Sequence, residues 1–176
     1  MTPNELAPLL PLMVIAVTPV IIMLVIAFYR SHTFSSLLAL AGIVVAFITL
    51  FGVQGARQVT SLLIIDDYAL FFMGLIFAAS FVVTLFSLGY LEGRRENIEE
   101  FSILLLLATL GSSVLAASSH FASFFIGIEI LSVSLYALIA YTRNELSIEA
   151  GVKYLILTAV SSAFLLFSPC GSAVFE

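Results

Sequence analysis

The stretch that decides the fold is residues 101–141, FSILLLLATLGSSVLAASSHFASFFIGIEILSVSLYALIAY, in which Glu129 is the only charged residue. One helix needs about 20 apolar residues to cross the hydrocarbon core of a bilayer, and this stretch has about twice that number. We therefore expect two spans joined by a tight hairpin at Ser118-Ser119-His120. A carboxylate near the middle of a span is costly, so Glu129 is a functional residue by default.

The rest of the chain has the same apolar character. Of its 176 residues, 62% are hydrophobic and 10% are charged, whereas roughly 25% are charged in soluble domains. Apolar windows of crossing length, joined by short connections, predict an all-α polytopic membrane protein with six transmembrane helices. We place these helices at about residues 8–28, 35–53, 68–90, 101–118, 121–141 and 148–168, followed by an atypical C-terminal tail at 169–176.

Composition also argues against several kinds of site. The formal charge of −5 comes from acids in loops and at span ends, without the basic stripe that nucleic-acid binding needs. Cys170 is the only cysteine, and neither histidine has a second ligand at metal spacing. We therefore expect no nucleic-acid partner, no metal site and no cofactor site in this chain.

The distribution of Lys and Arg predicts the orientation, because loops rich in these residues stay in the cytoplasm. Arg57 is the only such residue in the loops on the side of the N-terminus. Four arginines lie in the loops on the opposite side: Arg30, Arg94, Arg95 and Arg143. The N-terminus is therefore predicted to be periplasmic.

Glu129 has candidate partners on its own helix. At about 100° per residue, Ser132, Tyr136 and Arg143 lie on the same stripe as Glu129. Burial favours the protonated carboxyl group and a nearby cation favours the carboxylate, so such a group can load and release a proton. The alternative is a carboxylate that only fixes helix packing through hydrogen bonds. Both readings require the stripe to face the interior of the bundle.

Lys153 lies near the cytoplasmic end of the sixth predicted span. Glu149 precedes it by four residues, which is the favourable spacing of a surface ion pair on a helix, and a lysine close to a span end can reach the interface. The alternative is that Lys153 belongs to a buried polar axis and modulates an acid or carries a proton. Its depth differs from that of Glu129, so a direct pair would need water or a third group.

Asp66 and Asp67 stand directly before the third predicted span. An acid at this position can accept hydrogen bonds from free backbone N–H groups and complement the positive end of the helix dipole. We expect this capping role, with a place at an outer proton exit as the alternative.

A set of motifs within residues 120–167 points to a known family: FF-x-G-x-E, then Y-x-L-x-x-Y, then S-x-E-A-x-x-K-Y, then S-S-A-F-L-L-F. In order and spacing they resemble the antiporter-like membrane subunits of bacterial NADH:quinone oxidoreductase, respiratory complex I, and subunit N in particular. Weaker similarity, including IIDDYALFF at residues 64–72, extends to the N-terminus. Subunits M and L and the multisubunit cation/proton antiporters share the glutamate motif and remain competing assignments.

The resemblance implies a function for the charged residues. Glu129 matches the functional glutamate of the family's fifth helix and Lys153 the lysine of its sixth, which implies a proton relay supported by Ser132, Tyr136 and Glu149. In that family, NADH, FMN, iron–sulfur clusters and quinone are used by other subunits, and electron transfer there drives proton movement. The implied partners are other membrane subunits of complex I and the lipid bilayer, and the implied location is the bacterial inner membrane.

The sequence also departs from this family. Its members have roughly fourteen helices arranged with two inverted repeats, whereas this chain ends after its sixth expected span with the tail SPCGSAVFE. We therefore expect a truncated translocase subunit that is not competent alone. The alternatives are a subunit of a multisubunit cation/proton antiporter and a structural membrane scaffold in which Glu129 only fixes packing.

Overall fold

A computed structural model describes residues 7–28, 32–52, 57–58, 62–91 and 98–167. Its helices are the short 3₁₀ helix η1 (Ala7–Leu9), then α2 (Leu10–Phe28), α3 (His32–Phe51), α4 (Asp67–Leu91), α5 (Ile98–Ala117), α6 (Phe121–Ala140) and α7 (Glu145–Phe167). The six α-helices are all long and apolar enough to cross a membrane. The predicted all-α architecture of six transmembrane helices is therefore confirmed.

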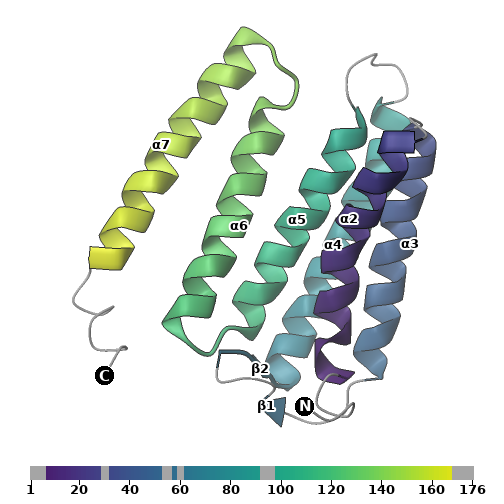
Figure 1. Cartoon of the computed structure of the whole chain (residues 1–176), viewed down its shortest axis with the longest axis vertical. Helices are drawn as coiled ribbons and strands as arrows, with labels where there is room; N and C mark the ends of the chain where they lie inside the picture. Colours follow the sequence, from purple (N-terminus) through teal and green to yellow (C-terminus); the bar gives the residue numbers. More distant parts are fainter. Residues whose placement is uncertain (1–6, 29–31, 53–56, 59–61, 92–97, 168–176) are drawn as a thin grey trace.

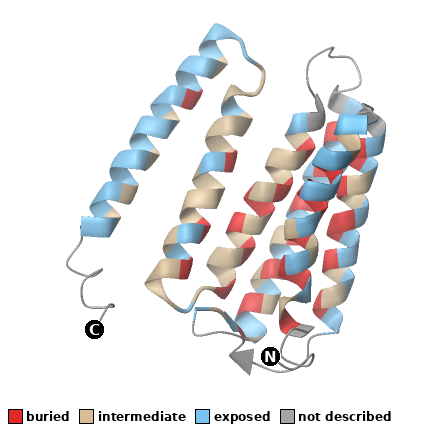
Figure 2. Ribbon diagram, in the orientation of Figure 1, coloured by how far each residue is buried: buried red, intermediate tan, exposed pale blue. Residues whose placement is uncertain are grey.

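The helices form a four-helix bundle with two further helices added at one side (Figure 1). Within the bundle, α2 packs against α3 and α5, and α4 also packs against α3 and α5. Helix α6 packs against α5, and α7 packs against α6 at the edge of the molecule. The buried residues are concentrated in α2 to α5, whereas α7 is almost entirely exposed (Figure 2).

The core of the bundle is apolar, with hydroxyl groups between the helices. Large side chains from four helices are fully or almost fully buried, among them Ile15, Ile43, Met73, Phe77 and Leu106. Two pairs of buried hydroxyls link helices: Ser36 and Ser102 at 3.3 Å, and Ser80 and Thr109 at 2.7 Å. Hydrogen bonds of this kind contribute about 0.6 kcal/mol each between helices in lipid.

Helices α5 and α6 approach each other closely at Gly111. A Cβ atom on Gly111 would lie 2.7 Å from the backbone N of Leu131 and 3.0 Å from its Cα. Small residues allow such contact between backbones, on which packing in lipid depends. Leu131 is two residues from Glu129, so this contact fixes the part of α6 that carries the acid.

The expected hairpin between α5 and α6 is present and has an unexpected partner. Helix α5 ends at Ala117 and α6 begins at Phe121. The loop before α4 contains two short antiparallel strands, β1 (Arg57–Gln58) and β2 (Ile64–Ile65). Leu62 in that loop accepts hydrogen bonds through its carbonyl from the backbone N of Ser119, at 3.1 Å, and from the Ser123 hydroxyl, at 2.7 Å. The loop before α4 and the α5–α6 hairpin are therefore hydrogen-bonded to each other at this end of the bundle.

Three helices begin three residues earlier than expected, because a hydropathy window misses polar first turns. Helix α3 begins at His32 instead of residue 35, α5 at Ile98 instead of residue 101, and α7 at Glu145 instead of residue 148. Asn144 caps α7, since its side-chain oxygen accepts from the backbone N of Ser147 at 3.2 Å. The predicted tail at 169–176 lies outside the described residues.

The capping role predicted before the third span is confirmed. Asp66 Oδ1 accepts a hydrogen bond from the backbone N of Ala69 at 2.7 Å. Asp67 lies in the first turn of α4, where a negative charge complements the helix dipole.

Candidate functional site

Glu129 lies midway along α6, between α5 and α7, and is half-buried. Its Oε1 accepts a hydrogen bond from the hydroxyl of Ser162 on α7. The acid is therefore held between two helices, as a carboxyl group in a membrane must be. A serine hydroxyl both donates and accepts hydrogen bonds, so this pair can pass a proton between the carboxylate and a further group beyond Ser162.

Ser162 cannot be recognised from the sequence alone, because serine in a helix has no distinctive pattern of its own. A weak signal was present in the half-buried face of α7, where small and polar residues recur at helical spacing: Gly151, Tyr154, Thr158 and Ser162. At Gly151 a Cβ atom would lie 2.9 Å from the Cβ of Ala140. This face therefore packs against α6 from the α6–α7 turn to the level of Glu129.

Ser132 and Tyr136 are half-buried on α6, as expected of the stripe that carries Glu129. The hydrogen bond of Glu129 runs across to α7, however, and not along this stripe. The inclusion of Arg143 in the stripe was wrong. Helix α6 ends at Ala140, and Arg143 follows with a φ of 52°, so helical periodicity does not reach it.

Arg143 instead connects the α6–α7 turn to the start of α5. Its guanidinium Nη2 lies 3.7 Å from Glu100 Oε2, and both side chains are largely exposed. An exposed pair at this distance contributes little to stability, at most about 1 kcal/mol. The turn between α6 and α7 lies at the end of the molecule opposite the strands (Figure 1).

Lys153 forms the expected local ion pair. Its Nζ lies 2.5 Å from Glu149 Oε1, and the two side chains are 73% and 59% exposed. Lys153 precedes Ser162 by nine residues, which corresponds to about two and a half turns and a rise of about 14 Å. Lys153 therefore lies on the opposite face of α7 from Ser162, and the structure does not bring it to Glu129.

The outer face of α7 that carries Lys153 is not covered by any described residue. It exposes large apolar side chains along its length: Leu146, Ile156, Leu157, Phe164 and Phe167. Among the described residues, no group of three His, Cys, Asp or Glu side chains lies close enough to hold a metal ion.

Residues 118–172 match the family model described as NADH:quinone oxidoreductase/Mrp antiporter, TM. A chain of respiratory complex I from Thermus thermophilus with bound aureothin is similar over 89% of this chain, with 26% identity and a TM-score of 0.75. The fold is that of an antiporter-like membrane subunit.

A second solved structure shares the fold over most of this chain. A chain of the membrane-bound sulfane sulfur reductase, an archaeal respiratory membrane complex, is similar over 91% of this chain, with 22% identity and a TM-score of 0.74. This chain spans 35% of the length of each of these two chains. Both belong to multisubunit membrane complexes, and the segment matched by the family model includes Glu129, Lys153 and Ser162.

Proposed function

We propose that this chain acts within a proton-translocating membrane subunit of an NADH:quinone oxidoreductase, with Glu129 as the group that takes up and releases the proton. The observation that carries the proposal is the half-buried carboxyl group of Glu129, held between α6 and α7 by the Ser162 hydroxyl. A half-buried acid that accepts a hydrogen bond from a hydroxyl and has no ion pair among the described residues is suited to proton transfer. In the order of its motifs the chain resembles subunit N of that enzyme.

The other parts of the proposal follow from this assignment. Lys153 modulates the relay or carries a proton, with Glu149 as its partner, and Ser132 and Tyr136 supply hydroxyls on the α6 stripe. NADH oxidation and quinone reduction take place in other subunits, which hold the FMN and iron–sulfur clusters. We place the chain in the bacterial inner membrane with a periplasmic N-terminus, in contact with other membrane subunits, and we propose that it does not translocate protons alone.

A cation/proton antiporter subunit is the second candidate, because the matched family model covers both classes. In that case an imposed sodium gradient, without NADH, would drive proton movement through the assembled complex. NADH-dependent proton movement that persists without sodium favours the oxidoreductase.

The decisive variant is Glu129→Gln in the assembled complex. Glutamine retains an oxygen that accepts from Ser162, so packing is preserved, but it cannot take up or release a proton. We expect proton pumping in inverted membrane vesicles, measured by quenching of a pH-sensitive dye, to fall at least about tenfold, as removal of a proton-transfer group predicts.

The matched control is Glu145→Gln, which makes the same chemical change at an exposed acid in the first turn of α7. It is expected to leave pumping unchanged, and native gels should show normal assembly of both variants. Normal pumping by the Glu129→Gln complex would refute the relay and leave a packing role.

A further inference from the structure

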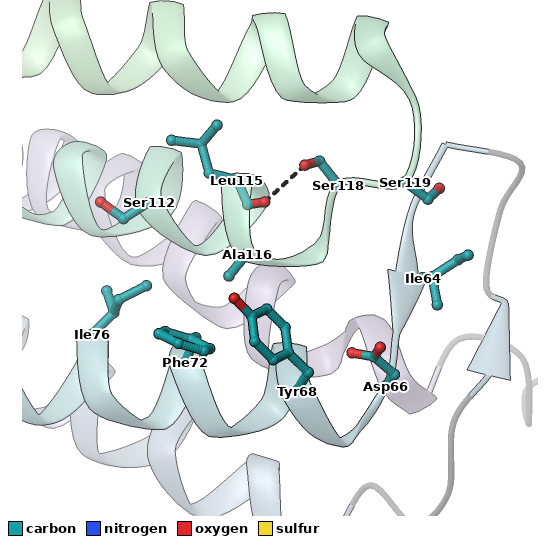
Figure 3. Close-up of a pocket in the computed structure, with 10 residues that line it drawn as sticks. All are labelled: Ile64, Asp66, Tyr68, Phe72, Ile76, Ser112, Leu115, Ala116, Ser118 and Ser119. Atoms are coloured by element: carbon teal, nitrogen blue, oxygen red, sulfur yellow. Dashed lines mark hydrogen bonds between the residues drawn. The ribbon is translucent and has the colours of Figure 1, made fainter. Parts of the chain in front are cut away.

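A second candidate site lies between α4 and α5, at the end of the bundle that carries the two strands. A cavity of about 570 Å³ opens there, between the start of α4 and the end of α5 (Figure 3). It is lined by Ile64, Asp66, Tyr68, Phe72, Ile76, Ser112, Leu115, Ala116, Ser118 and Ser119. Asp66 is the only charged member of this lining.

Two hydroxyls of the lining are already used as donors, whereas the carboxylate of Asp66 can accept further hydrogen bonds. The hydroxyls of Ser112 and Ser118 already donate to the carbonyls of Ala108, at 2.9 Å, and Leu115, at 2.8 Å. One oxygen of Asp66 accepts from the backbone of α4, and the carboxylate faces α5 beside Tyr68 (Figure 3). A ligand that donates hydrogen bonds and carries a positive charge matches these groups. A free anion would be repelled by the carboxylate of Asp66.

The lining of the cavity changes from polar at the end of the bundle to apolar deeper along α4. Asp66 stands at the end of the segment that can cross the membrane, which begins at Asp67, and tyrosines such as Tyr68 are typical of headgroup depth. From there the lining continues down α4 through Phe72 to Ile76. The separation of ten residues between Asp66 and Ile76 corresponds to a helical rise of about 15 Å. This is half of a hydrocarbon core of about 30 Å. The length and the apolar depth fit one acyl chain, and a small soluble amine would leave most of the cavity unfilled.

We propose that this cavity binds a phospholipid with a primary ammonium headgroup. The ammonium group donates hydrogen bonds to Asp66 and lies against the ring of Tyr68, which is 64% exposed and open to a cation. One acyl chain lies along Phe72 and Ile76. A quaternary ammonium headgroup has no N–H to donate, so the site discriminates against phosphatidylcholine.

The test is lipid retention by the purified full chain. The chain is released into native mass spectrometry from nanodiscs of equal parts phosphatidylethanolamine and phosphatidylcholine. Wild type is expected to retain the ethanolamine lipid over the choline lipid by about fivefold, the ratio that corresponds to a favourable interfacial ion pair. Stepwise N-methylation of the headgroup should lower retention at each step.

Asp66→Asn isolates the charge, because asparagine is as good an N-cap as aspartate. It should bring the retention ratio close to one. The matched control is Asp67→Asn, which removes the same charge one residue away at a side chain that does not line this cavity, and it should retain the wild-type ratio. An unchanged ratio in Asp66→Asn, or an equal loss in both variants, would overturn the proposal.

A second variant tests the acyl-chain part without altering charge. Ser112→Leu fills the deep part of the cavity and should abolish selective retention while circular dichroism shows unchanged helicity. Full retention in this variant would contradict the proposal. So would displacement of the bound lipid by millimolar ethanolamine, which would identify a soluble amine as the ligand.

Discussion

Replacing Gly111 by alanine should force α5 and α6 apart at the level of Glu129. The added Cβ atom would lie 2.7 Å from Leu131 N, 3.0 Å from Leu131 Cα and 3.1 Å from the carbonyl oxygen of Gly127. All three are backbone atoms, so none can rotate away. Ordinary contact begins at 3.4 Å, and one helix must therefore retreat by about 0.7 Å.

The expected cost combines two opposing effects. Overpacking of this kind destabilises by about 1–3 kcal/mol, whereas alanine in place of glycine in a helix stabilises by about 0.5–1 kcal/mol. Gly89 separates the two effects, because a Cβ atom there would have no heavy atom within 4 Å. Gly89→Ala reports the helix preference alone, so the difference in unfolding free energy between the two variants should be about 1–3 kcal/mol.

Reversible unfolding of the purified chain measures this difference. The protein in dodecyl maltoside micelles is titrated with sodium dodecyl sulfate, and helicity is followed by circular dichroism. Gly111→Ala should unfold at lower denaturant than Gly89→Ala. If the two variants shift stability by the same amount, the backbone contact between α5 and α6 does not exist, and the placement of Glu129 that depends on it is wrong.

Three further substitutions, the first with a control variant, test the contacts of α7 and of the α6–α7 turn by the same titration. Ser162→Ala removes the donor to Glu129 and should destabilise by about 0.6–1.7 kcal/mol, the range for hydrogen bonds between helices in lipid. Ser161→Ala, at an exposed neighbour, should change stability by less than about 0.5 kcal/mol. Equal effects of the two substitutions would argue against the hydrogen bond between Ser162 and Glu129. Lys153→Gln should cost less than about 0.5 kcal/mol, because its ion pair is an exposed one on a single helix, and a larger loss would show that Lys153 is buried against something. Arg143→Gly should relieve the φ of 52° and stabilise by up to about 1 kcal/mol, so a clear loss of stability would show that the exposed ion pair of Arg143 outweighs backbone strain.

The features that could be predicted from the sequence depend on residues that lie close together along the chain. Apolar length alone located six helices, and the spacing of Glu149 and Lys153 predicted an ion pair that the structure contains. Asp66 before an apolar run predicted a helix cap for the same reason. In each case the partners lie within one helical turn, so the helix geometry settles the contact before any tertiary packing is known.

The features that were missed depend on how distant segments meet. Ser162 is 33 positions from Glu129, and only the rotation of α7 about its axis decides which of its faces meets the acid. The two strands have two residues each, too few to show the alternation of a strand pattern. Arg143 was placed on the Glu129 stripe because periodicity was continued past Ala140, where the backbone leaves the helix.

The rotation of α7 also limits how Glu129 and Lys153 can interact. Lys153 faces away from α6, and the rise between Lys153 and Ser162 places the two charges at least about 14 Å apart. At such a distance, two charges interact by about 1 kcal/mol with an effective dielectric constant of 20. That is enough to bias a protonation equilibrium and far too little for a direct ion pair. Within the proposed relay, Lys153 therefore acts on Glu129 through space, or it exchanges protons with groups that lie against the outer face of α7.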